Sequence, residues 1–230
     1  MPIFDPLYFL VMLPGLAFML WAQWRVRSNY GRYSKVASRL GLTGAQVARR
    51  LLDQQGLQDV AIERIGGQLS DHYDPRQRVL RLSGEVHDGN SLASVGVAAH
   101  EMGHAVQHAV GYAPLNFRQA FYPVAAFASG AWTWLFFLGL ILGVATPLGR
   151  GLMLFAIVAL ALYVVFALVT LPVEYDASRR ALVLLESSHT LDADELQGAG
   201  KVLSAAGLTY VASAVQALLT LLYLLMRSRE

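Results

Sequence analysis

The sequence predicts an α-helical membrane protein with about four transmembrane helices and a small cytoplasmic domain of mixed α and β structure. Hydrophobic residues make up 55% of the 230 residues and charged residues only 15%, whereas soluble domains average about 25% charged residues. Four stretches contain no Asp, Glu, Lys or Arg: 6–24, 119–149, 151–173 and 202–226. Each is long enough to cross a hydrocarbon core of about 30 Å. This pattern excludes a disordered chain and a repeat solenoid.

The distribution of basic residues predicts the side of the membrane that each segment faces. Twelve Lys and Arg lie in 25–118 and three in 173–201, but only three lie in the segments between or beyond the other crossings. Because Lys and Arg concentrate in cytoplasmic loops, we expect both segments in the cytoplasm and both termini outside. The first stretch lacks a basic leading region and a small-residue cleavage pattern, so we expect an uncleaved anchor.

The apolar stretches divide the chain into three parts. Residues 1–24 are expected to form the first transmembrane helix and residues 25–118 the cytoplasmic domain. Residues 119–230 are expected to hold three further transmembrane helices, with a cytoplasmic connector at 173–207 that is polar over 186–200.

Capping and turn residues predict the elements of the cytoplasmic domain. In chain order, we expect a helix capped by Thr43 and ending near Gln55, strands at about 59–65 and 79–82 separated by a turn-rich run over 66–77, a loop over 84–89, and a helix capped by Asn90 or Ser91 and ending near Val110.

Composition limits the chemistry of the chain. It contains no cysteine, which excludes disulfides, thiolate metal sites and a cysteine nucleophile. Any metal must therefore be bound by His, Asp or Glu. The net charge is only +2, and the basic residues lie where membrane topology would put them, so we expect no nucleic-acid partner. The apolar stretches carry no ionisable group, which disfavours a transporter.

The second predicted helix carries the motif His100-Glu101-Met102-Gly103-His104. At 3.6 residues per turn the two histidines lie about 40° apart on one face and about 6 Å apart along the axis. Two imidazoles so placed can bind one zinc ion, and Glu101 points to an adjacent face from which its carboxylate can reach a water. The alternative is a pair of histidines that only form hydrogen bonds. Gly96 and Gly103 flank the ligand face, where we expect a substrate backbone to approach closely.

A catalytic zinc site needs a third protein ligand. Glu174 is the preferred candidate because it opens the cytoplasmic end of the third crossing and so faces the same side as His100 and His104. Asp176 is the rival candidate. The small residues that follow Glu174 would let this helix pack closely against the motif helix; they are Ala177, Ser178 and Ala181.

Other histidines are weaker candidates. His108 lies about 12 Å along the helix axis from His100, too far to share one ion, and is interpreted as a residue of the helix face or a support of the site. His72, His87 and Asp88 remain upstream alternatives.

These residues resemble those of the YugP-like bacterial membrane-bound neutral zinc metallopeptidases. The matching segments are Leu69–Pro75, Val79–Ser83, Gly89–Gln107 and Pro172–Ser178, and the likeness extends over nearly the whole chain. The resemblance implies a zincin-like, gluzincin-type metallopeptidase in the inner membrane of a bacterium. It implies one zinc ion bound by His100, His104 and Glu174, with Glu101 as the catalytic residue.

A looser resemblance is to the membrane proteases of the HtpX and Ste24 type, whose third ligand lies in an ExxAD pattern. Here the position four residues after Glu174 is Ser178, where that pattern has the Asp that orients a zinc-bound histidine. We therefore place Ser178, Tyr175, Arg180 and His72 among the residues that support the site or contact substrate.

These observations favour a membrane-embedded, zinc-dependent endopeptidase that cleaves peptides or membrane proteins in quality control or processing. We expect the substrate to lie along an edge strand at 79–83 and to pair with its backbone. The alternative is a non-catalytic, zinc-stabilised membrane scaffold, but a purely structural ion has no use for Glu101. The sequence leaves an oligomer or a scaffold partner open.

Overall fold

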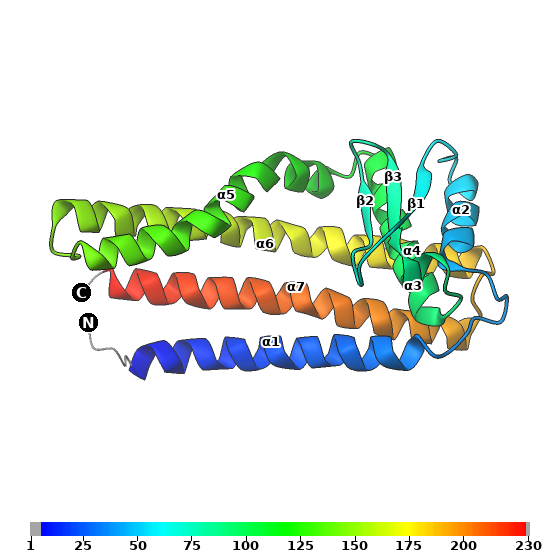
Figure 1. Ribbon diagram of the computed structural model, residues 1–230, viewed down its shortest axis with the longest axis horizontal. Helices are drawn as coiled ribbons and strands as arrows, with labels where there is room; N and C mark the ends of the chain where they lie inside the picture. Colours follow the sequence, from blue (N-terminus) through cyan, green and yellow to red (C-terminus); the bar gives the residue numbers. More distant parts are fainter. Residues whose placement is uncertain (1–5, 229–230) are drawn as a thin grey trace. The chain divides into compact units, whose positions relative to one another are not determined.

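The computed structural model describes residues 6–228 and is mostly helical, with one small sheet (Figure 1). The helices are α1 (Pro6–Tyr33), α2 (Gly44–Gln54), α3 (Gly84–His87), α4 (Leu92–Ala109), α5 (Ala113–Ile141), α6 (Pro147–Ser187) and α7 (Ala193–Arg227). The strands are β1 (Ala61–Ile65), β2 (His72–Asp74) and β3 (Val79–Ser83).

Within residues 6–228, four helices are long and apolar enough to cross a membrane: α1, α5, α6 and α7. This confirms the number of apolar helices expected from the sequence. Their surfaces expose large apolar side chains such as Leu10, Phe127 and Ile141, which suits contact with lipid. The helices extend beyond the charge-free stretches, since α1 continues to Tyr33 and α6 to Ser187.

The chain forms two compact units. Among the described residues, the first unit comprises 6–22, 116–171 and 209–228, and the second comprises 23–115 and 172–208. A small cluster around Leu160 and Tyr223 forms the core of the first unit. The second unit holds the sheet, α2, α3, α4 and parts of α1, α5, α6 and α7, and it contains every candidate site residue discussed below.

Both helix caps predicted in the second unit are confirmed. The Thr43 hydroxyl accepts a hydrogen bond from the Gln46 amide (3.3 Å), and the Gln46 side chain accepts one from the Thr43 amide (2.9 Å). This reciprocal capping box begins α2. At α4, the Ser91 hydroxyl accepts from the Ser94 amide (3.1 Å). Both helices then bury their apolar faces in one core.

The sheet has the order β1-β3-β2, so β3 is its central strand. It pairs in parallel with β1 and antiparallel with β2. The prediction of an edge strand at 79–83 is therefore wrong, because residues 72–74, expected to lie in a turn-rich run, form β2 on its other side. Residues 84–87, expected as loop, form α3. Within the described residues, the unpaired edges are those of β1 and β2.

The expected polar connector over 186–200 is mostly helical, because only residues 188–192 separate α6 from α7. The α7 helix begins with a second capping box. The Asp192 carboxylate accepts from the Glu195 amide (3.0 Å), and the Glu195 carboxylate accepts from the Asp192 amide (3.1 Å). An Asp followed three residues later by Glu is a capping signal that can be recognised in sequence.

The α4 helix packs closely against α6 at Gly103. A Cβ atom added to Gly103 would lie 2.5 Å from the backbone oxygen of Ala177, and one added to Gly96 would lie 3.4 Å from the Cβ of Ala199 in α7. The expectation that these glycines admit a substrate backbone is wrong, because neighbouring helices occupy both positions. Close approach of α4 and α6 depends on the missing side chain at Gly103.

We predict that Gly103→Ala destabilises the second unit, because the new methyl group must push the α6 backbone away. Overpacking of this kind costs about 1–3 kcal/mol, which should appear as a lower Tm in detergent. Gly31→Ala is the matched control, since no atom lies within 4 Å of its added Cβ. Equal Tm values for the two variants would contradict this account of the contact.

Candidate metal centre

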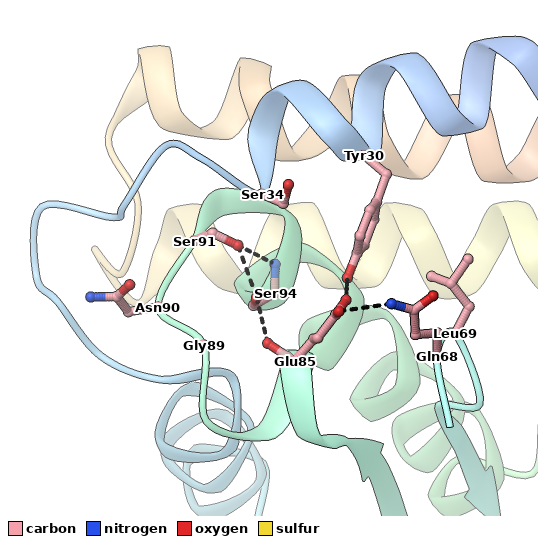
Figure 2. Close-up of a pocket in the computed structure, with 9 residues that line it drawn as sticks. All are labelled: Tyr30, Ser34, Gln68, Leu69, Glu85, Gly89, Asn90, Ser91 and Ser94. Carbon is pink, nitrogen blue, oxygen red and sulfur yellow. Dashed lines mark hydrogen bonds between the residues drawn. The ribbon is translucent and has the colours of Figure 1, made fainter. Parts of the chain in front are cut away.

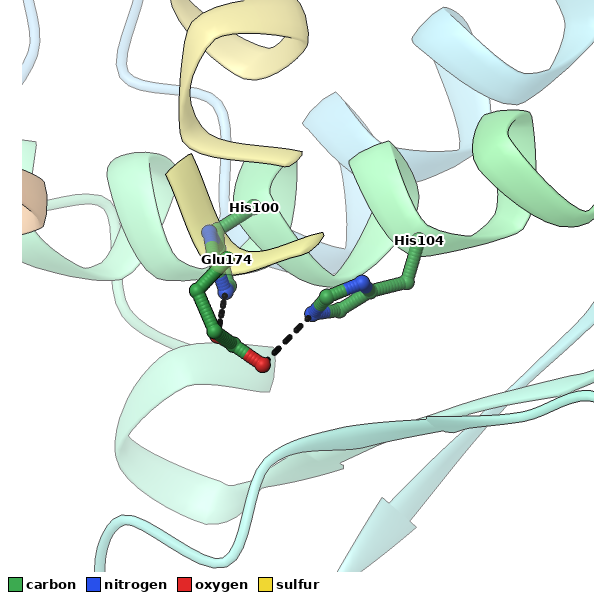
Figure 3. Close-up of side chains that lie close together, drawn as sticks. All are labelled: His100, His104 and Glu174. Atoms are coloured by element: carbon green, nitrogen blue, oxygen red, sulfur yellow. Dashed lines mark ion pairs between the residues drawn. The ribbon is translucent and has the colours of Figure 1, made fainter. Parts of the chain in front are cut away.

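Three side chains from two helices meet in the second unit. His100 and His104 project from α4 and Glu174 projects from α6 (Figure 3). Each offers one nitrogen or oxygen atom, and these atoms lie within 4.8 Å of one another. Among the described residues, these three side chains are the group of His, Asp or Glu residues close enough together to hold a metal ion.

The distances within this group suit a zinc ion. His100 Nε2 lies 3.3 Å from Glu174 Oε2, and His104 Nε2 lies 3.8 Å from Glu174 Oε1. Ligand atoms about 2.0–2.1 Å from a tetrahedral ion are about 3.4 Å apart. The two rings meet nearly edge to face, with centroids 4.9 Å apart at 80°. Two imidazoles and a carboxylate are a common donor set for catalytic zinc, so the residues fit the ion.

The group is largely screened from solvent. The side chain of Glu174 is only 2% exposed, compared with 14% for His100 and 11% for His104. A buried carboxylate is costly unless a positive charge or several donors face it. Burial alone would lower the pKa of His104, but the nearby carboxylates of Glu174 and Glu101 outweigh burial and raise that pKa.

The other nitrogen of each imidazole is held by a different side chain. His100 Nδ1 lies 3.0 Å from the Ser178 hydroxyl, and His104 Nδ1 lies 2.9 Å from Gln107 Oε1. Both Nε2 atoms are thereby directed toward Glu174. Ser178 occupies the position where the ExxAD pattern has Asp, and it makes the contact with histidine that such an Asp would make.

Glu101 follows His100 on α4 and stays partly exposed to solvent. It lies close enough to His104 for its charge to raise the pKa of that histidine. A carboxylate at the border between the buried group and solvent can exchange a proton with a water that reaches the metal centre.

Asp176, the rival third ligand, lies outside the group. Its carboxylate accepts hydrogen bonds from Arg179 Nη2 (2.7 Å), Arg180 Nε (2.6 Å) and Gln107 Nε2 (2.9 Å). Arg180, expected near the site, is thus held by Asp176 and lies over the ring of Tyr112. The structure does not bring Arg180 into contact with Glu174.

The remaining expected residues are also separate from the group. Tyr175 is 47% exposed and lies beside Gly207 of α7. The His72 ring is hydrogen-bonded to the Ser70 carbonyl oxygen (2.8 Å). His108 is hydrogen-bonded to the Tyr73 hydroxyl (2.9 Å), and this contact joins α4 to β2. The upstream pair His87 and Asp88 contact each other (2.6 Å).

Sequence reasoning missed Gln107. Its position three residues after His104 could have indicated this contact, because residues three apart lie on the same face of a helix.

A polar pocket lies at the other end of α4, beside its N-cap (Figure 2). Its centre is Glu85, whose carboxylate accepts from the Tyr30 hydroxyl (3.2 Å) and from Gln68 Nε2 (3.0 Å). None of the three grouped residues lines it. Ser91, at its edge, lies about 13 Å along the helix axis from His100. This pocket is distinct from the metal centre.

Comparison with known proteins supplies independent information. A protein family described as "Putative neutral zinc metallopeptidase" matches residues 8–229. The "Putative membrane protease YugP" of Bacillus subtilis (strain 168) is 45% identical over 220 residues, which cover 96% of each chain. No solved structure matches the chain.

We predict that zinc affinity falls as the pH is lowered, because zinc binds the deprotonated imidazole and must displace a proton. The raised pKa of His104 moves this competition to a higher pH than for an ordinary histidine, whose pKa is about 6.5. Below the pKa of His104 the Kd should rise about tenfold per pH unit for each proton displaced. Titration against a chromophoric chelator from pH 8.5 to 5.5 would measure this. A Kd independent of pH would contradict the assignment of His104 as a ligand.

Proposed function

The chain belongs to the neutral zinc metallopeptidase family, and we propose that it is a membrane-embedded zinc endopeptidase with His100, His104 and Glu174 as ligands and Glu101 as the catalytic residue. The observation that carries the proposal is the meeting of both Nε2 atoms with one buried carboxylate at 3.3 and 3.8 Å. The family description supports zinc as the ion.

The proposed roles follow from the positions of the side chains. The bound ion would supply a Lewis acid that makes water a nucleophile at neutral pH and polarises the scissile carbonyl. Glu101 takes a proton from the attacking water and delivers it to the nitrogen of the leaving amine. Glu174 stays ionised between the imidazoles, while Ser178 and Gln107 hold the two rings in place.

An extended substrate would pair with the edge of β2 rather than with β3. The contact between Tyr73 and His108 ties β2 to α4, the helix that carries the histidines. Recognition through backbone hydrogen bonds tolerates many side chains. Such tolerance suits the degradation or processing of misfolded and unassembled membrane proteins, which we propose as substrates.

We further propose that the chain crosses the plasma membrane several times, with the active site on the cytoplasmic side. The four apolar helices and the membrane protease relative support a membrane location. The concentration of basic residues in 25–118 and 173–201 supports the orientation.

We predict that Glu101→Gln keeps zinc but loses about 10²–10⁴-fold in cleavage rate, because an amide cannot carry the proton. Zinc content and casein cleavage of the detergent-purified protein would measure both effects. Glu186→Gln, an exposed substitution in the last turn of α6, is the control and should change neither.

Glu174→Ala should lose zinc, because the two remaining imidazoles bind the ion weakly.

Cleavage by Glu101→Gln at the wild-type rate would reject the catalytic role of Glu101. A wild-type protein that binds zinc but cleaves no substrate would favour the zinc-stabilised scaffold.

A further inference from the structure

We propose that Gln107 is a positioning residue that sets the tautomer and ring orientation of His104, so that Nε2 is presented to the metal. Within the proposed function, on which this inference rests, the role is to preorganise one of the two imidazole ligands. Asp176 and its two arginines in turn hold the amide of Gln107.

Gln107 lies one turn after His104 on α4 and is fully buried. Its Oε1 atom lies 2.9 Å from His104 Nδ1. Its Nε2 atom lies 2.8 Å from the Val173 carbonyl oxygen and 2.9 Å from Asp176 Oδ2. The amide therefore uses both of its N–H groups on α6 and its oxygen on the histidine.

These partners leave one orientation for the amide. The Val173 carbonyl and the Asp176 carboxylate only accept hydrogen bonds, so the amide nitrogen must face them. The amide oxygen must then face His104, and an oxygen acceptor requires a proton on Nδ1. In neutral His104 the lone pair is consequently on Nε2, the atom that faces Glu174.

Two arginines hold Asp176, the residue that accepts from the Gln107 amide. Arg179 and Arg180 both donate to Asp176, which favours its ionised form as an acceptor for Gln107. His100 is held differently, because its partner is the Ser178 hydroxyl. A hydroxyl can rotate to donate or accept, so it does not select a tautomer. The control of the tautomer is therefore specific to His104.

The first test is Gln107→Leu, which replaces the amide with an apolar side chain of similar size. We expect the zinc Kd to rise about 10–100-fold, and the visible absorption bands of the cobalt-substituted protein to shift as His104 changes geometry. Thr190→Val is the matched control, because it removes a buried hydroxyl that is hydrogen-bonded to Ser188 (2.7 Å) and to none of the three grouped residues. It should lower the Tm but leave the zinc Kd and the cobalt spectrum unchanged.

A second pair of variants separates positioning from folding. Gln107→Glu alone places an acceptor against the Val173 carbonyl and the Asp176 carboxylate, so zinc binding should weaken. The double variant Gln107→Glu/Asp176→Asn restores a donor opposite that acceptor and has the net charge of the wild type. We expect it to recover at least about tenfold in zinc affinity relative to Gln107→Glu.

The outcomes distinguish this inference from the proposed function. A wild-type protein that binds zinc, with the same Kd for Gln107→Leu, would overturn the role of Gln107 and leave the peptidase proposal intact. A double variant that binds zinc no better than Gln107→Glu would also overturn it. A wild-type protein with no zinc affinity would reject both proposals.

Discussion

The candidate site depends on how closely α4 approaches α6. His100 and His104 lie on one helix and Glu174 on the other, and the carboxylate reaches both imidazoles at 3.3 and 3.8 Å. That approach needs Gly103, whose missing side chain leaves room for the backbone of Ala177, a residue with no exposed surface. Side chains span only a few ångströms. If a methyl group at position 103 pushed the two helices apart, the proposed ligands would therefore separate.

The polar side chains buried beside this helix contact are paired with other polar groups. Glu174 is buried, and two imidazoles face it. Each imidazole is held from behind by a neutral partner, Ser178 or Gln107. The second buried carboxylate, Asp176, is matched by two arginines that reach toward the surface. Because both buried carboxylates face imidazoles or arginines, the polar cluster can exist between tightly packed helices.

Local signals predicted the helices more accurately than the sheet. Thr43 and Ser91 cap α2 and α4 as expected, because a capping hydroxyl acts on amides within three residues. The short β2 and α3 were missed. The three residues of β2 have no pattern of their own and form a strand because they pair with β3, while Asp71 binds the backbone amide of Ser83 from across the turn (2.7 Å). The same pairing made β3 central.

The sequence by itself determined the relation of His100, Glu101 and His104, because the helical period places neighbouring turns on one face regardless of their surroundings. It also singled out Glu174, the first acidic residue after the charge-free stretch 151–173, as the preferred partner of the two histidines. Only the tertiary structure placed Glu174 beside both histidines, placed Asp176 beside two arginines, and brought in Gln107. The rotation of α6 about its axis against α4 set those contacts, and that rotation depends on packing between residues about 70 positions apart.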